Sequence, residues 1–199
     1  MGSRPSHVTR NRGRWILIGI FLLFFVPVIF AWLLNVESPA WLPFAETNHG
    51  DLIRPSLSFP LTNLRTTDAR PVPTELLQGK WTLVYVERSD CVADCERAIY
   101  RTRQVRHALG KDMQRIQRLL VVASANVQAT VNRVQKYDAG ISVVAAEPRW
   151  FESASFVRSG ADIYLVDPQG YLVMSYAKTA DPSGLISDLE RLLKISKIG

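Results

Sequence analysis

Cys91 and Cys95 are the residues of this 199-residue chain whose type and spacing could do chemistry, and they are its only thiols. Because they stand four positions apart in the stretch CVADC, their sulfurs can approach closely enough to form a disulfide or to hold one metal ion. The preceding stretch WTLVYVE is typical of a buried strand, and apolar residues recur at helical spacing after the pair. We therefore expect the cysteines at a junction between a strand and a helix.

The start of a helix favours thiolate chemistry, because unpaired backbone N–H groups and the positive end of the helix dipole stabilise negative charge there. We expect Cys91 just before the helix, as the more exposed and attacking sulfur, and Cys95 in the first turn, as the resolving sulfur. The acidic neighbours Asp90 and Asp94 oppose thiolate formation, whereas Arg88 favours it. The residue types therefore do not decide whether the pKa of the thiol is raised or lowered. The alternative is a structural disulfide, although a bridge over so short a loop constrains the unfolded chain little.

The N-terminal region predicts a membrane anchor. Residues 15–34, WILIGIFLLFFVPVIFAWLL, contain no charge and would span about 30 Å as a helix, the thickness of a bilayer core. This apolar run is longer than the core of about 7–15 residues found in signal peptides. Four arginines precede it, and no Lys or Arg follows before Arg54, so the positive-inside rule places residues 1–14 in the cytoplasm. We expect a single-pass protein of the inner (cytoplasmic) membrane with a periplasmic C-terminal domain.

The composition is that of a globular protein, with 47% hydrophobic and 21% charged residues. The formal net charge is +6, but four of the basic residues belong to the topology signal, and no basic run is interleaved with aromatic residues, so nucleic acid is not expected as a partner. The basic residues within 97–115 are interpreted as the solvated face of a helix, with a docking surface for an acidic partner as the alternative. No G-x-S-x-G, H-E-x-x-H or phosphate-loop motif is present.

The remaining pattern divides the chain after its anchor into two parts. Residues 35–75 are rich in Pro, Thr, Asn and Asp and are expected to be a tether and lead-in with one short strand near residues 57–61. Residues 76–199 predict an α/β domain with a thioredoxin-like central β-sheet flanked by helices. Trp81, Tyr85 and Tyr100 are expected in its core. The expected elements are the strand WTLVYVE, a helix ending at Gly110, the strand RLLVVAS, a helix capped by Asn126, the strand GISVVAAE, a hairpin around DPQG and a final amphipathic helix.

Residues 79–193 resemble the Sco (SenC) family, membrane-anchored thioredoxin-fold proteins that deliver copper to cytochrome c oxidase and take part in its thiol chemistry. The matching features are the C-x-x-x-C pair after a strand, the hairpin IYLVDPQGYLV with a terminal helix, and the single anchor. The resemblance implies that Cys91 and Cys95 assist assembly of a respiratory oxidase by thiol–disulfide exchange or copper(I) handling, with an oxidase subunit or assembly factor as partner. As an enzyme the chain would be at most a thiol–disulfide oxidoreductase. The alternative is a non-catalytic, membrane-tethered interaction module in which Cys91–Cys95 is a structural disulfide.

One departure from the Sco pattern concerns the metal. Family members bind copper through the two cysteines and a histidine in the loop before the YLVDP strand, where this chain has residues 158–160, Arg-Ser-Gly. His7 is expected across the membrane, and His107 lies about 18 Å along the helix from Cys95. His49 is expected to be a solvated loop histidine, with a third-ligand role open if the lead-in folds back. We therefore expect copper(I) to bind weakly or not at all.

Overall fold

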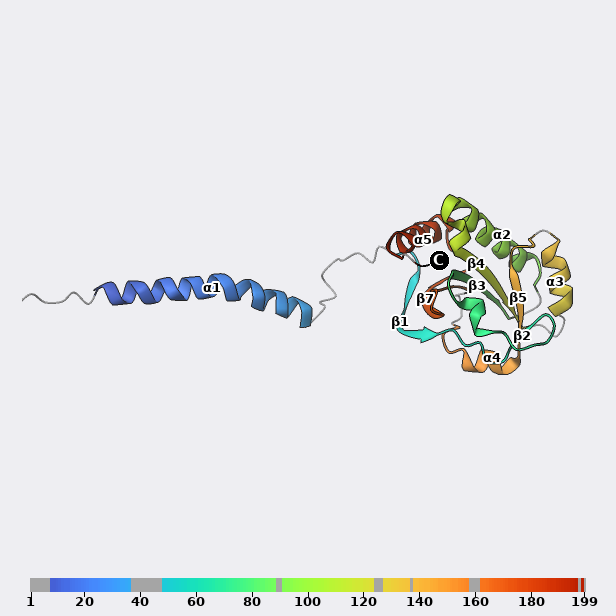
Figure 1. Ribbon diagram of the computed structural model, residues 1–199, viewed down its shortest axis with the longest axis horizontal. Coiled ribbons are helices and arrows are strands. Elements are labelled where there is room, and N and C mark those ends of the chain that lie inside the picture. The colour runs from blue at the N-terminus through green and yellow to red at the C-terminus, as the bar shows by residue number, and fades with distance from the viewer. Residues whose placement is uncertain are drawn as a thin grey trace, which may run out of the picture. The chain divides into compact units, whose positions relative to one another are not determined.

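The computed structural model describes residues 8–36, 48–88, 91–123, 127–136, 138–157, 162–196 and 198. The chain divides into two compact units, residues 1–47 and 48–199 (Figure 1). In the first unit, helix α1 (Val8–Val36) contains Pro27, and its stretch Gly13–Leu33 has a mean hydropathy of 2.9. By length and composition this stretch can cross a membrane, as the apolar run predicted.

The second unit is built on one seven-stranded sheet, ordered β1-β7-β6-β3-β4-β5-β2. Strand β3 lies at its centre, parallel to β4 and antiparallel to β6, and β4 is parallel to β5. Six of the seven residues of β3 are buried, as expected for an apolar run covered on both faces. The strands are β1 (Asp51–Ser58), β2 (Leu64–Thr66), β3 (Trp81–Glu87), β4 (Ile116–Val122), β5 (Ser142–Ala146), β6 (Ile163–Val166) and β7 (Tyr171–Tyr176).

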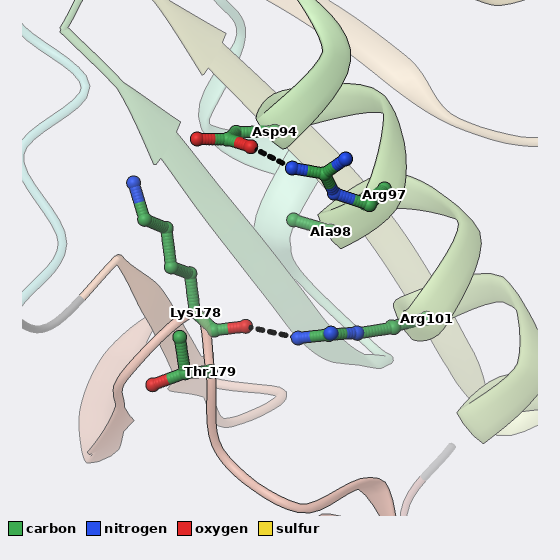
Figure 2. Close-up of a pocket in the computed structure, with 6 residues that line it drawn as sticks. All are labelled: Asp94, Arg97, Ala98, Arg101, Lys178 and Thr179. Atoms are coloured by element: carbon green, nitrogen blue, oxygen red, sulfur yellow. Dashed lines mark hydrogen bonds and ion pairs between the residues drawn. The ribbon is translucent and has the colours of Figure 1, made fainter.

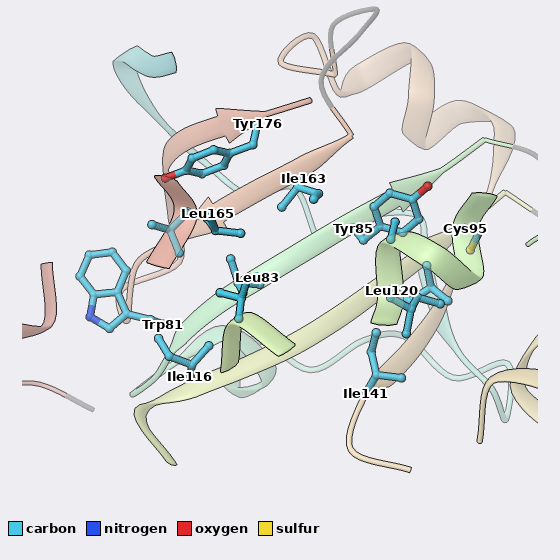
Figure 3. Packing of buried hydrophobic residues seen from close by; sticks show 14 of the residues in the cluster. Trp81, Leu83, Tyr85, Cys95, Ile116, Leu120, Ile141, Ile163, Leu165 and Tyr176 are labelled. Atoms are coloured by element: carbon cyan, nitrogen blue, oxygen red, sulfur yellow. The ribbon is translucent and has the colours of Figure 1, made fainter. Parts of the chain in front are cut away.

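Helices and the lead-in cover the two faces of this sheet. Successive strand side chains point to opposite faces, so Leu83 and Tyr85 of β3 pack beneath α2, α3 and α5 (Figure 3), while Val84 packs on the other face with Trp150 of α4. The expected thioredoxin-like sheet flanked by helices is confirmed. The helices are α2 (Ala93–Ala108), α3 (Val127–Gln135), α4 (Pro148–Ser153) and α5 (Pro182–Ile195), with 3-10 helices η1 (Thr74–Leu77) and η2 (Gly110–Arg115).

The lead-in differs from its expected form. Instead of one strand near residues 57–61, it contributes two strands, and they form both edges of the sheet: β1 pairs with β7, and β2 pairs with β5. The compact unit thus begins at Asn48, well before residue 76. β1 and β2 pair with strands that lie some 80 to 120 residues later in the chain. Such distant pairing produces no periodic pattern within a short stretch of sequence, so the two strands are not predictable from it. The helix cap expected at Asn126 lies outside the described residues.

The start of this unit is fastened to α5 by a buried carboxylate. Asp188, whose side chain is fully buried, accepts hydrogen bonds from the backbone N–H groups of His49 (2.8 Å) and Gly50 (3.0 Å) and from the Tyr176 hydroxyl (3.0 Å). The His49 ring nitrogen Nδ1 lies 3.2 Å from the same carboxylate. The lead-in does fold back, but it brings His49 to Asp188.

Candidate functional site

A disulfide joins Cys91 and Cys95 at the start of α2, with their Cα atoms 5.1 Å apart. Cys91 lies between β3 and the helix, Val92 is the N-cap residue, and Cys95 is the third residue of α2. The expected strand–helix junction is therefore confirmed. At this position the backbone N–H groups of the first helical turn point toward the N-terminal end of α2, the end at which a thiolate would form on reduction.

Both cysteines are buried, each with 1% of its surface exposed. The expectation that Cys91 is the more exposed of the two is therefore wrong. Its position before the helix does not expose it, because it belongs to the same core cluster as Cys95, Tyr85 and Leu120. Figure 3 labels the last three between the sheet and α2. The intervening Val92 is 56% exposed, so this apolar side chain forms part of the surface beside the disulfide.

Arg133 contacts the disulfide loop from α3, and sequence reasoning missed it. Its Nη1 donates a hydrogen bond to the backbone carbonyl oxygen of Cys91 at 2.7 Å. This hydrogen bond holds the guanidinium against the backbone of the residue whose sulfur would carry the thiolate, so its positive charge favours that thiolate. In the sequence Arg133 is one basic residue on the polar side of an amphipathic helix, and nothing there connects it with a cysteine 42 positions earlier.

Replacing Arg133 by methionine should slow the reaction of reduced Cys91 with an uncharged alkylating reagent about threefold to tenfold at neutral pH, because a nearby cation favours the reactive thiolate. Arg133→Lys should retain much of the rate, since it keeps the charge. The pH dependence of alkylation, followed by mass spectrometry of the two cysteines, measures the effect. Arg149→Met, an exposed substitution on α4, is the matched control. Unchanged pH profiles in Arg133→Met would contradict an electrostatic role.

Carboxylates at the C-terminal end of β3, the end next to Cys91, oppose the effect of Arg133 on a thiolate. The Tyr85 hydroxyl donates to Oε2 of Glu87 at 3.1 Å, and burial, reinforced by the Glu87 charge, strongly raises the pKa of Tyr85. Asp162, whose carbonyl accepts the Val86 N–H, also has a raised pKa, mainly through burial, with Glu87 adding to the effect and Lys178 opposing it. Negative charge at this edge disfavours a thiolate, whereas Arg133 favours one.

One of the three aromatic residues expected in the core is not there. Trp81 and Tyr85 are buried, but Tyr100 is 59% exposed, so that expectation is wrong for Tyr100. Adjacent helical residues point about 100° apart, and Ile99, fully buried, takes the inward direction. Tyr100 consequently lies on the outer surface of α2.

The described residues hold no group of three or more His, Cys, Asp or Glu side chains that could bind a metal ion. His49 contacts Asp188, and His107 is exposed near the far end of α2. Residues 158–160, where the Sco histidine was expected to be missing, lie outside the described part of the chain. Copper(I) accepts few ligands and prefers thiolates, so Cys91 and Cys95 fit it as a two-sulfur set only after the disulfide is reduced.

The fold and the disulfide define a thioredoxin-like protein that carries a candidate membrane helix. A family model described as the transmembrane-like, thioredoxin-like, C-terminal domain matches residues 81–196, and the chain belongs to that family. The matched segment begins at β3 and includes both cysteines and α5. A comparison with curated protein sequences finds no match.

Solved structures of Sco proteins share this fold. Copper-bound ScoI of Arabidopsis thaliana has a TM-score of 0.58 at 16% identity, over 70% of this chain and 99% of that one. Copper-bound Sco1 of yeast has a TM-score of 0.58 at 17% identity, over 71% and 95%. BsSco, described as containing a disulfide switch and as a member of the Sco family of cytochrome c oxidase assembly proteins, has a TM-score of 0.52 at 13% identity, over 72% and 99%. The resemblance to Sco proteins is thus confirmed at the level of the fold.

Proposed function

We propose that this chain is a membrane-anchored thioredoxin-fold protein that assists assembly of a respiratory cytochrome oxidase by thiol–disulfide exchange through Cys91 and Cys95. The observation that carries the proposal is the disulfide between these residues at the start of α2. The Sco-like fold supports the oxidase as the setting, because BsSco combines a disulfide switch with membership of an oxidase-assembly family. The four arginines within residues 1–14 support, by the positive-inside rule, a cytoplasmic N-terminus and periplasmic thiols as part of this proposal.

The proposed exchange has two steps. In the dithiol form, the Cys91 thiolate attacks a disulfide of the partner protein, so one partner thiolate leaves and a mixed disulfide forms. The Cys95 thiolate then attacks the Cys91 sulfur, which releases the second partner thiolate and closes the Cys91–Cys95 disulfide. Two electrons pass from the pair to the partner, which gains two protons as its thiolates are protonated. A thiol reductant in the same compartment restores the dithiol form.

Copper(I) handling is a second use of the same sulfurs, with the ion as cargo. It is supported by the copper-bound Sco structures of similar fold. Two thiolates suffice for copper(I), but a protonated guanidinium cannot ligate and a neutral hydroxyl is a poor ligand, so Arg158 and Ser159 add little. We expect weaker copper(I) binding than a site with an added histidine would show.

A structural disulfide in a non-catalytic interaction module remains the alternative, and the burial of both sulfurs favours it. The two functions differ in redox behaviour. A disulfide that exchanges is reduced at a mild potential, whereas structural disulfides resist reduction down to potentials below about −300 mV.

The Cys95→Ser variant should accumulate a mixed disulfide between Cys91 and an oxidase subunit or assembly factor, because the resolving thiol is gone. The adduct is measured by non-reducing electrophoresis of membranes containing the full chain, followed by mass spectrometry. The Cys91→Ser/Cys95→Ser double variant is the control and should form none. Absence of any adduct, together with a reduction potential below about −300 mV, would favour the structural disulfide.

A further inference from the structure

The surface next to the disulfide combines exposed apolar side chains with a shallow groove on α2. Val92 and Tyr100 are 56% and 59% exposed, although side chains of this kind are usually buried in a domain core. A groove of about 590 Å³ is lined by Ala93, Glu96, Arg97, Tyr100 and Arg101. Its lining begins at Ala93, two residues after Cys91 along the chain, so the groove starts at the same end of α2 as the disulfide.

A second, smaller hollow of about 150 Å³ lies between α2 and the turn that follows β7, lined by Asp94, Arg97, Ala98, Arg101, Lys178 and Thr179 (Figure 2). Arg97 and Arg101 line both hollows, so the two form one continuous surface. Figure 2 shows the two arginines reaching from α2 and Lys178 coming from the facing turn.

Positive charge predominates on this surface. Three cations line the two hollows, Arg97, Arg101 and Lys178, against the two carboxylates Asp94 and Glu96. Arg97 forms an ion pair with Asp94. Arg101 instead donates from Nη1 to the carbonyl oxygen of Lys178 at 2.9 Å, a contact that orients its guanidinium without neutralising it. Figure 2 shows the Lys178 side chain extending away from Arg101, so the two cations offer separate charge-assisted hydrogen bonds to different carboxylates of a partner.

We propose that Val92, Ala93, Arg97, Tyr100, Arg101 and Lys178, the α2 docking surface, bind an acidic segment of the redox partner that also presents an apolar side chain. The partner's carboxylates contact Arg101 and Lys178, and its apolar side chain packs on Tyr100 and Val92. Docking here brings the partner's sulfur to a disulfide that is itself buried. The identity of the segment as part of a thiol partner rests on the proposed function.

The test uses the full chain in nanodiscs of neutral phosphatidylcholine and two fluorescent peptides that differ only in carrying Glu or Lys around a shared Leu and Ser. Fluorescence anisotropy measures their binding. At about 0.01 M salt the Glu peptide should bind about threefold to tenfold more tightly than the Lys peptide, and at about 1 M salt this preference should disappear. Equal affinities at low salt would overturn the proposal.

Variants locate the preference on the surface. Lys178→Glu and Arg101→Glu should each remove or reverse it, and Lys178→Glu leaves the Arg101 hydrogen bond to the backbone carbonyl in place. Tyr100→Ser should weaken binding of both peptides. Lys111→Glu makes the same charge change at an exposed position of η2 and should leave the preference intact. An equal effect of Lys111→Glu, or loss of Glu-peptide binding when the nanodiscs contain anionic phosphatidylglycerol, would overturn the protein-docking role.

The same peptides with Cys in place of Ser separate this proposal from the proposed function. If the Glu peptide reduces the Cys91–Cys95 disulfide faster than the Lys peptide does, and Lys178→Glu slows that reduction, the docking surface and the exchange function are both supported. If the Glu peptide binds preferentially but neither peptide exchanges with the disulfide, the docking surface stands and the exchange function fails. If both peptides exchange equally fast, the function stands and the docking surface fails.

Discussion

Replacing Arg118 by methionine should lower the free energy of unfolding by about 3–5 kcal/mol, the range found when one partner of a buried ion pair is removed. The guanidinium of Arg118, on β4, donates to both carboxylate oxygens of Asp138 at 2.6 and 2.7 Å, and their side chains are only 2% and 4% exposed. Methionine would leave the Asp138 charge buried with the Gly140 N–H as its remaining donor among the described contacts. Denaturant unfolding of the full chain in detergent, followed by near-ultraviolet circular dichroism, measures the loss.

A double variant tests that reasoning. Arg118→Met/Asp138→Asn should recover most of the lost stability, because the penalty comes from an uncompensated charge and not from the missing pair itself. Lys111→Met, at an exposed position, should change stability by no more than about 0.5 kcal/mol. A double variant as unstable as Arg118→Met alone would show that packing of the Arg118 stem, not the charge, carries the effect.

The Arg118–Asp138 pair also predicts acid sensitivity. Burial by itself would raise the pKa of Asp138, but the hydrogen bonds and charge of Arg118 outweigh it, so the pKa is lowered overall. A lowered pKa in the folded state means that the contribution to stability is complete above the ordinary aspartate pKa of about 3.9 and is lost as the pH falls through the folded value. Below about pH 4 the wild type should therefore lose stability relative to the double variant, which lacks this carboxylate.

Replacing Asp188 by asparagine should lower the free energy of unfolding by about 2–4 kcal/mol, since hydrogen bonds to a charged group contribute about 1.5–3 kcal/mol each. The carboxylate of Asp188 is buried and accepts from His49, Gly50 and Tyr176, all donors, whereas an asparagine side chain turns one acceptor into a donor. The same unfolding experiment measures the change. Glu190→Gln, exposed on the same helix, is the matched control and should have little effect.

The effect of Asp188→Asn should depend on pH in the same direction. Burial would raise the pKa of Asp188, but its hydrogen bonds to Gly50, His49 and Tyr176 lower it overall. The stabilisation is therefore complete above about pH 3.9 and is lost as the pH falls through the lower folded value. A loss that grows as the solution is acidified would contradict this sign and point to a neutral carboxyl group in the folded protein.

The sequence by itself determined the features that depend on short stretches of chain. The apolar run of α1, the central strand β3, and the placement of Cys91 and Cys95 around the start of α2 all follow from periodicity and spacing within about twenty residues. The hairpin of β6 and β7 likewise follows from its turn, where Asp167 accepts hydrogen bonds from the N–H groups of Gln169 and Tyr171. In each case the interactions that specify the element lie inside it.

Only the tertiary structure decided the features that join distant residues. β1 and β2 are strands because β7 and β5 supply their hydrogen-bonding partners. Cys91 is as buried as Cys95 because both pack into the core. The contact of Arg133 with Cys91 spans 42 residues, and that of Asp188 with Gly50 spans 138. The pairing of a cation with a particular carbonyl or carboxylate depends on how the helices pack against the sheet. No local pattern of residue types along the chain predicts that packing geometry.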